Sequence, residues 1–367
     1  MKGDGDTAEA RETFQHYMKA VRFTRDVLPE HARNLSEAID CPSWAARLLQ
    51  LRQRNDVHEL AAAEQELMQR VFRHVLRYVH PSKGSGTEFR ESYRRGFPTE
   101  TIASKEATCF SGPWLTAALL MEAGIPEEQL LYCNVFEDSP ESRDWAGTHG
   151  ALLLRTSANR MFFIDHGYRR AGAPFYIWMT KGMRERARAK ETILGGSRGV
   201  HLMEMEDPKH AGALDLPSLF QLMPLREGIM SGHMLHVGID FLNRGMLKEA
   251  AHAFDIGLTA NPKDPDLHCY RGRVAMQLGD DFGALDSFDS AMRAYPRHLM
   301  TLFSIGEYWR SKGRHEIARN SFVAVAFDPR PIWGEGWIRG KAREYLGLPA
   351  EEQPGEAERF LLDYEGK

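Results

Sequence analysis

The hydrophobic positions between residues 7 and 79 follow a helical pattern. In the second half of this stretch, apolar side chains recur every three or four residues among Ala, Glu, Gln, Leu and Arg, at Leu60, Ala63, Leu67, Val71 and Val75. This spacing lines them up on one face of an α-helix. A cluster rich in Pro, Ser and Gly interrupts the pattern at residues 81–86, as such clusters do in loops. We therefore predict a helical N-terminal region over residues 1–80.

From about residue 87 the pattern changes to a short helix followed by strands. An apolar run, Trp114–Ala123, stops at Gly124-Ile125-Pro126, where Gly suits the left-handed residue after a helix and Pro prevents its continuation. Three strand-like runs follow, separated by polar turns. They are Leu130–Phe136, Gly150–Leu154 and Met161–Ile164. The pattern predicts an α+β core over residues 81–229.

The last third of the chain carries a repeat of 34 residues. Small and aromatic residues recur at this spacing in four series: Gly238, Gly272, Gly306 and Gly340; Gly245, Gly279, Gly313 and Gly347; Ala250, Ala284 and Ala318; Phe254, Phe288 and Phe322. Small residues at fixed intervals let paired helices approach closely, and this period is similar to that of the tetratricopeptide repeat (TPR) family. His268 and Ala275 depart from the family's usual Trp and Tyr. The resemblance implies an α-helical TPR solenoid with C-terminal capping helices over residues 230–367.

Charge and cysteine content narrow the class of protein. Lys and Arg number 47 against 51 Asp and Glu, and a formal net charge of −4 gives no field that would attract nucleic acid or an anionic membrane. No run of 18 apolar residues marks a membrane span, and the first residues lack the apolar run of a secretory signal. The four cysteines, Cys41, Cys109, Cys133 and Cys269, show no CxxC spacing, which favours a reducing compartment. We expect a cytoplasmic protein with no nucleic-acid or membrane partner.

Three residues of the α+β segment are candidates for chemistry. Cys109 comes just before the apolar helix, His149 opens one strand-like run and Asp165 closes the next. If residue 155 faces residue 159 across the hairpin, His149 lies directly opposite Asp165, within reach of an imidazole to carboxylate hydrogen bond. This register is an assumption, because another loop length would change it. A helix N-terminus favours a thiolate at Cys109, whether the capping residue is Cys109 itself or Ser111.

The same residues resemble the transglutaminase-like superfamily of papain-type cysteine enzymes. Ala107-Thr108-Cys109 with Ala123-Gly124-Ile125-Pro126 looks like its cysteine-helix motif, and Thr148-His149-Gly150-Ala151 with Phe163-Ile164-Asp165 looks like its histidine and aspartate strands. The resemblance covers about residues 87–168 and implies a papain-like core. It also implies three roles: Cys109 as nucleophile, His149 as general base and acid, and Asp165 as the group that orients the imidazole. Neither a cofactor nor a metal is implied.

The resemblance leaves the reaction outcome open. Phe110-Ser111-Gly112-Pro113 is not typical of the family, and no upstream residue identifies itself as the second oxyanion donor. We expect a cysteine-dependent acyl-transfer enzyme that acts on an amide through a thioester, with the repeats recruiting a peptide or protein. Peptide hydrolase and transglutaminase or amide synthase are alternatives within this class. A non-catalytic TPR scaffold with an inactive transglutaminase-like domain is the rival from another class.

Two further sets of residues are expected to have structural roles. Cys41, Cys133 and Cys269 are read as buried residues of the core, the usual place of free cysteine. His233 and His236 lie at positions i and i+3 of a predicted helix, a spacing that metal ligands use, but no third ligand accompanies them. We therefore predict no metal site.

Overall fold

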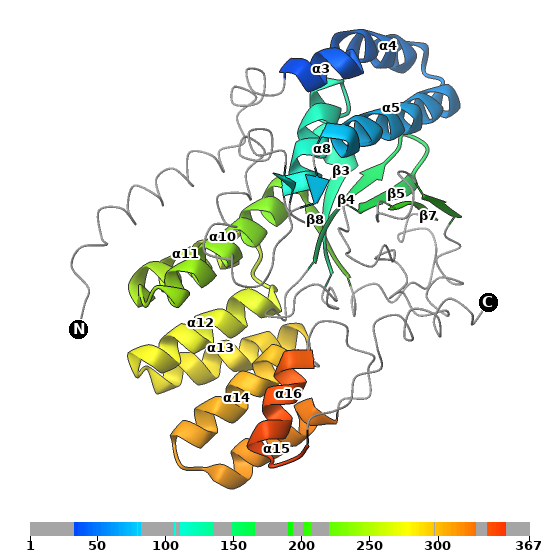
Figure 1. The fold of residues 1–367 in the computed structure, drawn as a ribbon. Coiled ribbons are helices and arrows are strands. Elements are labelled where there is room, and N and C mark those ends of the chain that lie inside the picture. The colour runs from blue at the N-terminus through cyan, green and yellow to red at the C-terminus, as the bar shows by residue number, and fades with distance from the viewer. Residues whose placement is uncertain are drawn as a thin grey trace.

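A computed structural model of the chain describes residues 33–78, 80–81, 106–107, 111–135, 149–165, 190–193, 201–206, 220–296, 298–327 and 336–349. Within these residues, eleven α-helices accompany a six-stranded antiparallel sheet (Figure 1). Three N-terminal helices lie toward one end of the sheet, and a stack of helices from the C-terminal half lies toward the other end. The predicted α+β class is confirmed at this level.

The N-terminal helices are α3 (Arg33–Ile39), α4 (Cys41–Arg54) and α5 (Val57–Tyr78). All five apolar positions that predicted a helix lie in α5, and each is at least nine-tenths buried. They pack in the same hydrophobic core as apolar residues of the sheet. Residues 33–78 of the predicted helical region thus form these three helices and their connections, His80 belongs to a short strand, and residues 1–32 and 79 lie outside the described part of the chain.

The sheet has the strand order β6-β7-β5-β4-β3-β8, and every neighbouring pair is antiparallel. Its strands are β3 (Leu130–Val135), β4 (His149–Arg155), β5 (Arg160–Asp165), β6 (Lys190–Ile193), β7 (His201–Glu206) and β8 (Phe220–Pro224). The three strands predicted from the sequence are β3, β4 and β5. A separate parallel pair joins β1 (His80–Pro81) to β2 (Glu106–Ala107).

One apolar helix, α8 (Ser111–Glu122), packs against the sheet and the N-terminal helices. It begins three residues before the predicted start, because Pro113 falls in the first helical turn, where its missing N–H leaves no bond unmade. It ends as predicted: Gly124 has a φ of 97°, the Ile125 N–H donates to the Leu120 carbonyl and the Gly124 N–H donates to the Met121 carbonyl. This hydrogen-bond pair is a Schellman motif.

The C-terminal half forms three helical hairpins followed by a single helix. The helices are α10 (Leu225–Asn243), α11 (Leu247–Ala260), α12 (Pro265–Leu278), α13 (Asp281–Ala294), α14 (Leu299–Ser311), α15 (His315–Ala326) and α16 (Gly336–Tyr345). The second helices of the hairpins begin at Leu247, Asp281 and His315, which are 34 residues apart. The period seen in the sequence is thus the period of the helix pairs.

The Gly series that begins at Gly245 ends the first helix of each hairpin and, at Gly347, the last helix. All four residues have a positive φ, between 68° and 78°. Each stands in a Schellman motif, in which the N–H of the residue after the Gly donates to the carbonyl five residues before it, at Phe241, Ala275, Trp309 and Arg343. An L-amino acid with a side chain rarely adopts this backbone conformation, so Gly at this spacing fixes where each helix stops.

The other Gly series makes room for the Phe series. A Cβ atom added at Gly272 would lie 2.6 Å from Cε1 of Phe288, and one added at Gly306 would lie 2.6 Å from Cε1 of Phe322. Phe254 stands over Gly238 in the same way. The ring of each second helix therefore rests directly on the backbone of the first, which is why both residues recur together.

The helical hairpins continue from the sheet without a linker. The first turns of α10 lie against β3, where Gly228 faces the Tyr132 ring so closely that a Cβ atom would clash with it. Later residues of the same helix, such as Phe241, pack with α11 and α12, and one hydrophobic core runs from α3 to α16. The boundary predicted between residues 229 and 230 therefore falls inside a continuous helix, because no residue near it interrupts the helical pattern.

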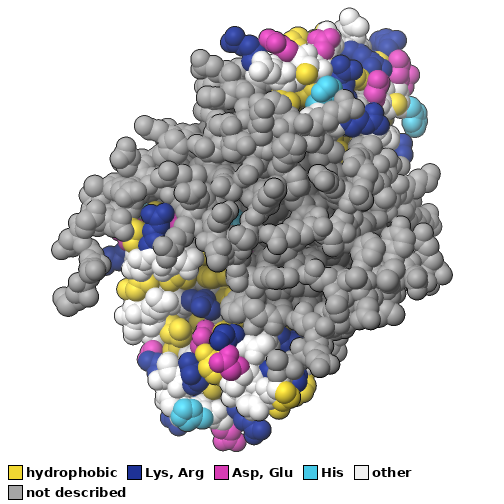
Figure 2. All heavy atoms as spheres, in the orientation of Figure 1, with side chains coloured by type: hydrophobic (Ala, Val, Ile, Leu, Met, Phe, Trp, Pro, Cys, Tyr) yellow, Lys and Arg dark blue, Asp and Glu magenta, His cyan; other side chains and the backbone are white. Residues whose placement is uncertain are grey.

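Charged side chains on the described surface are mixed in sign. On the face shown in Figure 2, Lys and Arg lie among Asp and Glu over both the N-terminal helices and the helical hairpins. This mixture agrees with the small formal net charge. Within the described residues, no helix is both long and apolar enough to cross a membrane.

Candidate active site

The hairpin of β4 and β5 has a register different from the one assumed. Leu152 pairs with Ile164 and Arg155 pairs with Met161, so the assumption that residue 155 faces residue 159 is wrong by two residues. The loop closes through two backbone hydrogen bonds, from the Thr156 N–H to the Arg160 carbonyl at 2.9 Å and from the Asn159 N–H to the Thr156 carbonyl at 2.8 Å.

The left-handed residue of this loop explains the register. The loop has three residues, 157–159, and its last residue, Asn159, has a left-handed backbone with a φ of 57°. In the assumed register the equivalent position would be Ala158. Asn tolerates the left-handed conformation because its short polar side chain bonds locally, whereas Ala does not. The observed register, which places Asn159 at the left-handed position, is therefore favoured over the assumed one.

The observed register makes His149 and Asp165 diagonal rather than direct neighbours. Continued by one residue, the pairing puts Asp165 opposite Ala151, and His149 lies two residues further along β4. Diagonal neighbours of an antiparallel pair are about 7 to 8 Å apart, still within reach of long side chains. Only the backbones of these two residues are described, and Cys109 lies outside the described part of the chain.

Alternation along the strands assigns His149, Ala151 and Asp165 to the same face of the sheet. The other face carries Leu152 and Leu154, which belong to the core that contains α8. His149 is the first residue of β4 and Asp165 is the last residue of β5. Any site that they share therefore lies at the end of the sheet.

That end of the sheet faces the helical hairpins, and α8 begins on the same side. In the first turn of α8, the Trp114 ring meets the His233 ring of α10, with centroids 4.8 Å apart. At its other end, Gly124 accepts a hydrogen bond of 2.8 Å from Arg52 of α4. Both α8 and β4 therefore start beside the hairpins and run toward the N-terminal helices, as Figure 1 shows.

The opposite end of the β4–β5 hairpin is held by a buried carboxylate. Glu64 of α5 is fully buried and accepts hydrogen bonds from the Ser157 N–H and hydroxyl, both at 2.7 Å, and from the Gln129 amide at 3.1 Å. Arg52 lies 3.9 Å from the same carboxylate. The loop that sets the register is thereby fixed to α5.

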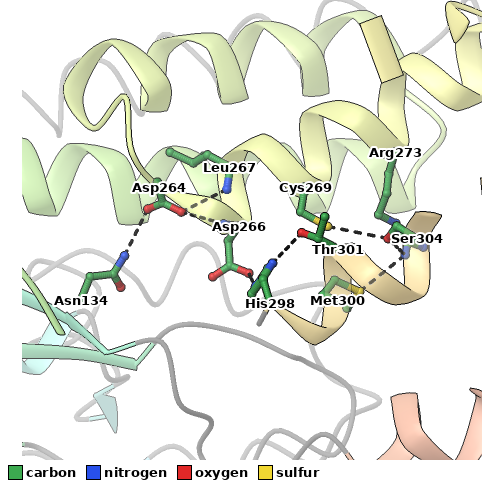
Figure 3. A network of polar contacts seen from close by, with 10 residues as sticks. All are labelled: Asn134, Asp264, Asp266, Leu267, Cys269, Arg273, His298, Met300, Thr301 and Ser304. Carbon is green, nitrogen blue, oxygen red and sulfur yellow. Dashed lines mark hydrogen bonds and ion pairs between the residues drawn. The ribbon is translucent and has the colours of Figure 1, made fainter. Parts of the chain in front are cut away.

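A buried polar network joins the sheet to the second hairpin (Figure 3). The Asn134 amide of β3 donates to Asp264 at 3.1 Å, and Asp264 caps α12 by accepting from the backbone N–H groups of Asp266 and Leu267. Burial and the charge of Asp266 raise the pKa of Asp264 to about 7. Since Asn134 pairs with Gly150 in the sheet, this network adjoins the start of β4.

The network continues to the third hairpin through an ion pair. His298, before the first turn of α14, lies 3.0 Å from the Asp266 carboxylate, and its other ring nitrogen is 2.7 Å from the Thr301 hydroxyl. Burial would lower the pKa of His298, but the charge of Asp266 and the hydrogen bond to it raise the pKa to about 10. The imidazole is therefore protonated at neutral pH and is no general base.

Cys41, Cys133 and Cys269 are all buried thiols. Burial raises the pKa of Cys41 to about 11, so its thiol is unreactive. His233 is buried against Trp114, and burial lowers the pKa of His236 to about 4. Among the residues whose side chains are described, no group of three His, Cys, Asp or Glu is arranged to hold a metal ion.

One residue near the candidate site was not singled out by the sequence. His201 opens β7 and pairs directly with Asp165, because β7 lies beside β5. The alternation of residues 201–206, His-Leu-Met-Glu-Met-Glu, has the period of a strand and is a signal that could have found β7. Its pairing with β5 has no local signal.

The sequence was also compared with known proteins. No protein-family model matches the chain, and no curated protein matches it.

Proposed function

We propose that the chain is a cysteine-dependent acyl-transfer enzyme in which Cys109, His149 and Asp165 form the catalytic triad. One observation carries this proposal: the start of α8, which follows Cys109 by two residues, the start of β4 and the end of β5 all lie at the end of the sheet that faces the hairpins. Helix α8 packs on the face of the sheet opposite to the one assigned to His149 and Asp165. At the end of the sheet the two faces meet, so Cys109, which precedes α8, could reach both residues there.

The reaction proceeds through a thioester. The Cys109 thiolate adds to an amide carbonyl carbon, backbone N–H groups at the start of the helix stabilise the oxyanion, and His149 gives its proton to the departing amine. The C–N bond breaks and an acyl–sulfur bond remains. His149 then takes a proton from water or from a second amine, which attacks the thioester and releases the thiolate. Asp165 keeps the imidazole oriented and stabilises its charged form.

We further propose that the helical hairpins are tetratricopeptide repeats that recruit a peptide or protein substrate. The 34-residue period of the helix starts, the Gly-on-Phe packing and the four Schellman motifs support this assignment. Helices α12 and α14 are joined by mostly buried Arg273 and Glu307, whose charged groups lie 3.5 Å apart. The surface of a stack of helical repeats suits an extended peptide better than a small metabolite.

The test of the triad is the pH dependence of Cys109 alkylation, measured by iodoacetamide labelling and peptide mapping. Faster labelling of Cys109 than of the other three cysteines would not by itself identify a catalytic thiol, because those three are buried and protected from the reagent. A catalytic thiolate beside an imidazole titrates well below the ordinary value of about 8.5. We expect a midpoint below about 7 for Cys109, and in His149→Gln a return toward about 8.5. His315→Gln, at an exposed position of α15, is the matched control and should leave the midpoint unchanged.

A Cys109 midpoint near the ordinary value in the unmodified protein would refute the enzyme and favour a non-catalytic scaffold. If the thiol is activated, mass spectrometry of the protein after exposure to a cell lysate should detect an acyl group on Cys109. The mass of that group identifies the substrate. Added amines that increase turnover would indicate transfer, and an unchanged rate would indicate hydrolysis.

A further inference from the structure

A single row of residues crosses the sheet at the level of the candidate site. Asp165 of β5 pairs directly with His201 of β7, and His201 pairs on its other side with Ile193 of β6. On the opposite flank of Asp165, the β4–β5 register puts Ala151, which pairs in turn with Cys133. Asp165 therefore has an imidazole-bearing residue as one direct neighbour and an alanine as the other.

This arrangement differs from a simple His149–Asp165 pair. Direct cross-strand neighbours have Cβ atoms about 4.5 to 5.5 Å apart, whereas diagonal neighbours are about 7 to 8 Å apart. His201 is thus nearer to Asp165 by backbone register than His149 is. Ala151 has no hydrogen-bonding side chain, so by register these two histidines are the described strand neighbours that could pair with a carboxylate at Asp165.

We propose that His201 is a positioning residue of the candidate active site, which competes with His149 for the Asp165 carboxylate. The inference rests on the proposed function for the role of His149. When His201 is protonated, its positive charge opposes a second positive charge on His149. Protonation of His201 on acidification would then weaken the thiolate–imidazolium pair, in which His149 already carries its proton. By register, Glu191 of β6 is the other charged residue among the described strand neighbours of His201 on this face, in the diagonal position.

The test is an NMR titration of the full chain, in a chelating buffer, with its 15 histidines labelled by ¹³C at Cε1. His201→Gln and His149→Gln identify the two signals. Asp165→Asn removes the charge and keeps the shape, and it should lower the pKa of His201 by about one unit, since an opposite charge at about 4 to 6 Å shifts a pKa by about 1 to 3 units. Glu206→Gln is the matched control, because Glu206 faces Arg160 at the far end of the same strand pair.

The reverse measurement keeps the test decisive if Asp165→Asn fails to fold. In His201→Gln the competitor is absent, so the pKa of His149 should rise and the acidic limb of Cys109 alkylation should move to lower pH. The inference is overturned if the pKa of His201 is unchanged in Asp165→Asn, or if the pKa of His149 is unchanged in His201→Gln. The proposed function fails separately, when the Cys109 midpoint is ordinary in the unmodified protein.

Discussion

Replacement of Glu64 by alanine should destabilise the protein strongly, because its carboxylate is fully buried and accepts three hydrogen bonds. A hydrogen bond to a charged group contributes about 1.5 to 3 kcal/mol. The three bonds share one carboxylate, and half-buried Ser157 regains some contact with water, so their values do not add in full. Arg52 retains its bond to the Gly124 carbonyl and loses little. We therefore expect a loss of about 3 to 5 kcal/mol, the range for breaking one partner of a buried ionic contact.

Glu66 is the matched control, two residues away on the same helix. Its ion pair with Arg47 is 3.0 Å long, but both side chains are about half exposed, and such pairs contribute about 0 to 1 kcal/mol. Thermal unfolding at pH 7 should give a Tm for Glu64→Ala that is roughly 6 to 10 °C lower, at about 2 °C per kcal/mol for a chain of this size. Equal Tm values for Glu64→Ala and Glu66→Ala would refute the idea that this carboxylate holds the β4–β5 loop.

Two further predictions concern the helical hairpins. Gly272→Ala should destabilise the protein by about 1 to 3 kcal/mol, because its new Cβ would crowd Phe288. Gly340→Ala, with open space at the same repeat position, should stabilise it by up to about 1 kcal/mol. Urea unfolding of both variants checks this, and a change of stability in the same direction for both contradicts it. The raised pKa of His298 contributes stability that is complete below its ordinary value of 6.5 and is lost as the pH approaches about 10. The urea midpoint should therefore fall between pH 7 and pH 10 in the unmodified protein and fall less in His298→Gln; parallel curves would show that the ion pair with Asp266 does not titrate in this range.

The sequence predicted the helical hairpins well because their determinants are local. Gly279 must adopt a left-handed backbone and Gly272 must admit the Phe288 ring, so each requirement is visible as a residue type at a fixed spacing. The same holds for the end of α8 at Gly124. These helices are therefore recognisable from the residues at their ends and on their buried faces.

The candidate site was harder to predict because its geometry depends on contacts between distant segments. The hairpin register follows from Asn159, a local signal that the assumed pairing overlooked. The neighbour of Asp165 on β7 is 36 residues away, and nothing in the intervening sequence announces that pairing. The continuity of α10 across the predicted boundary is also a tertiary effect, since its first half is stabilised by β3 and its second half by α11.

The continuous α10 sets a fixed length scale. With 19 residues it is about 28 Å long, and a helix of that length is stiff. A substrate docked on the hairpins would be presented to the end of the sheet by a rod and not by a tether, so the statistics of a flexible linker do not apply. Such a protein would select substrates by the separation between the docked segment and the reacting bond. If the proposed function holds, chains in which this separation is too short or too long would bind and remain unprocessed, and α10 would act as a molecular ruler.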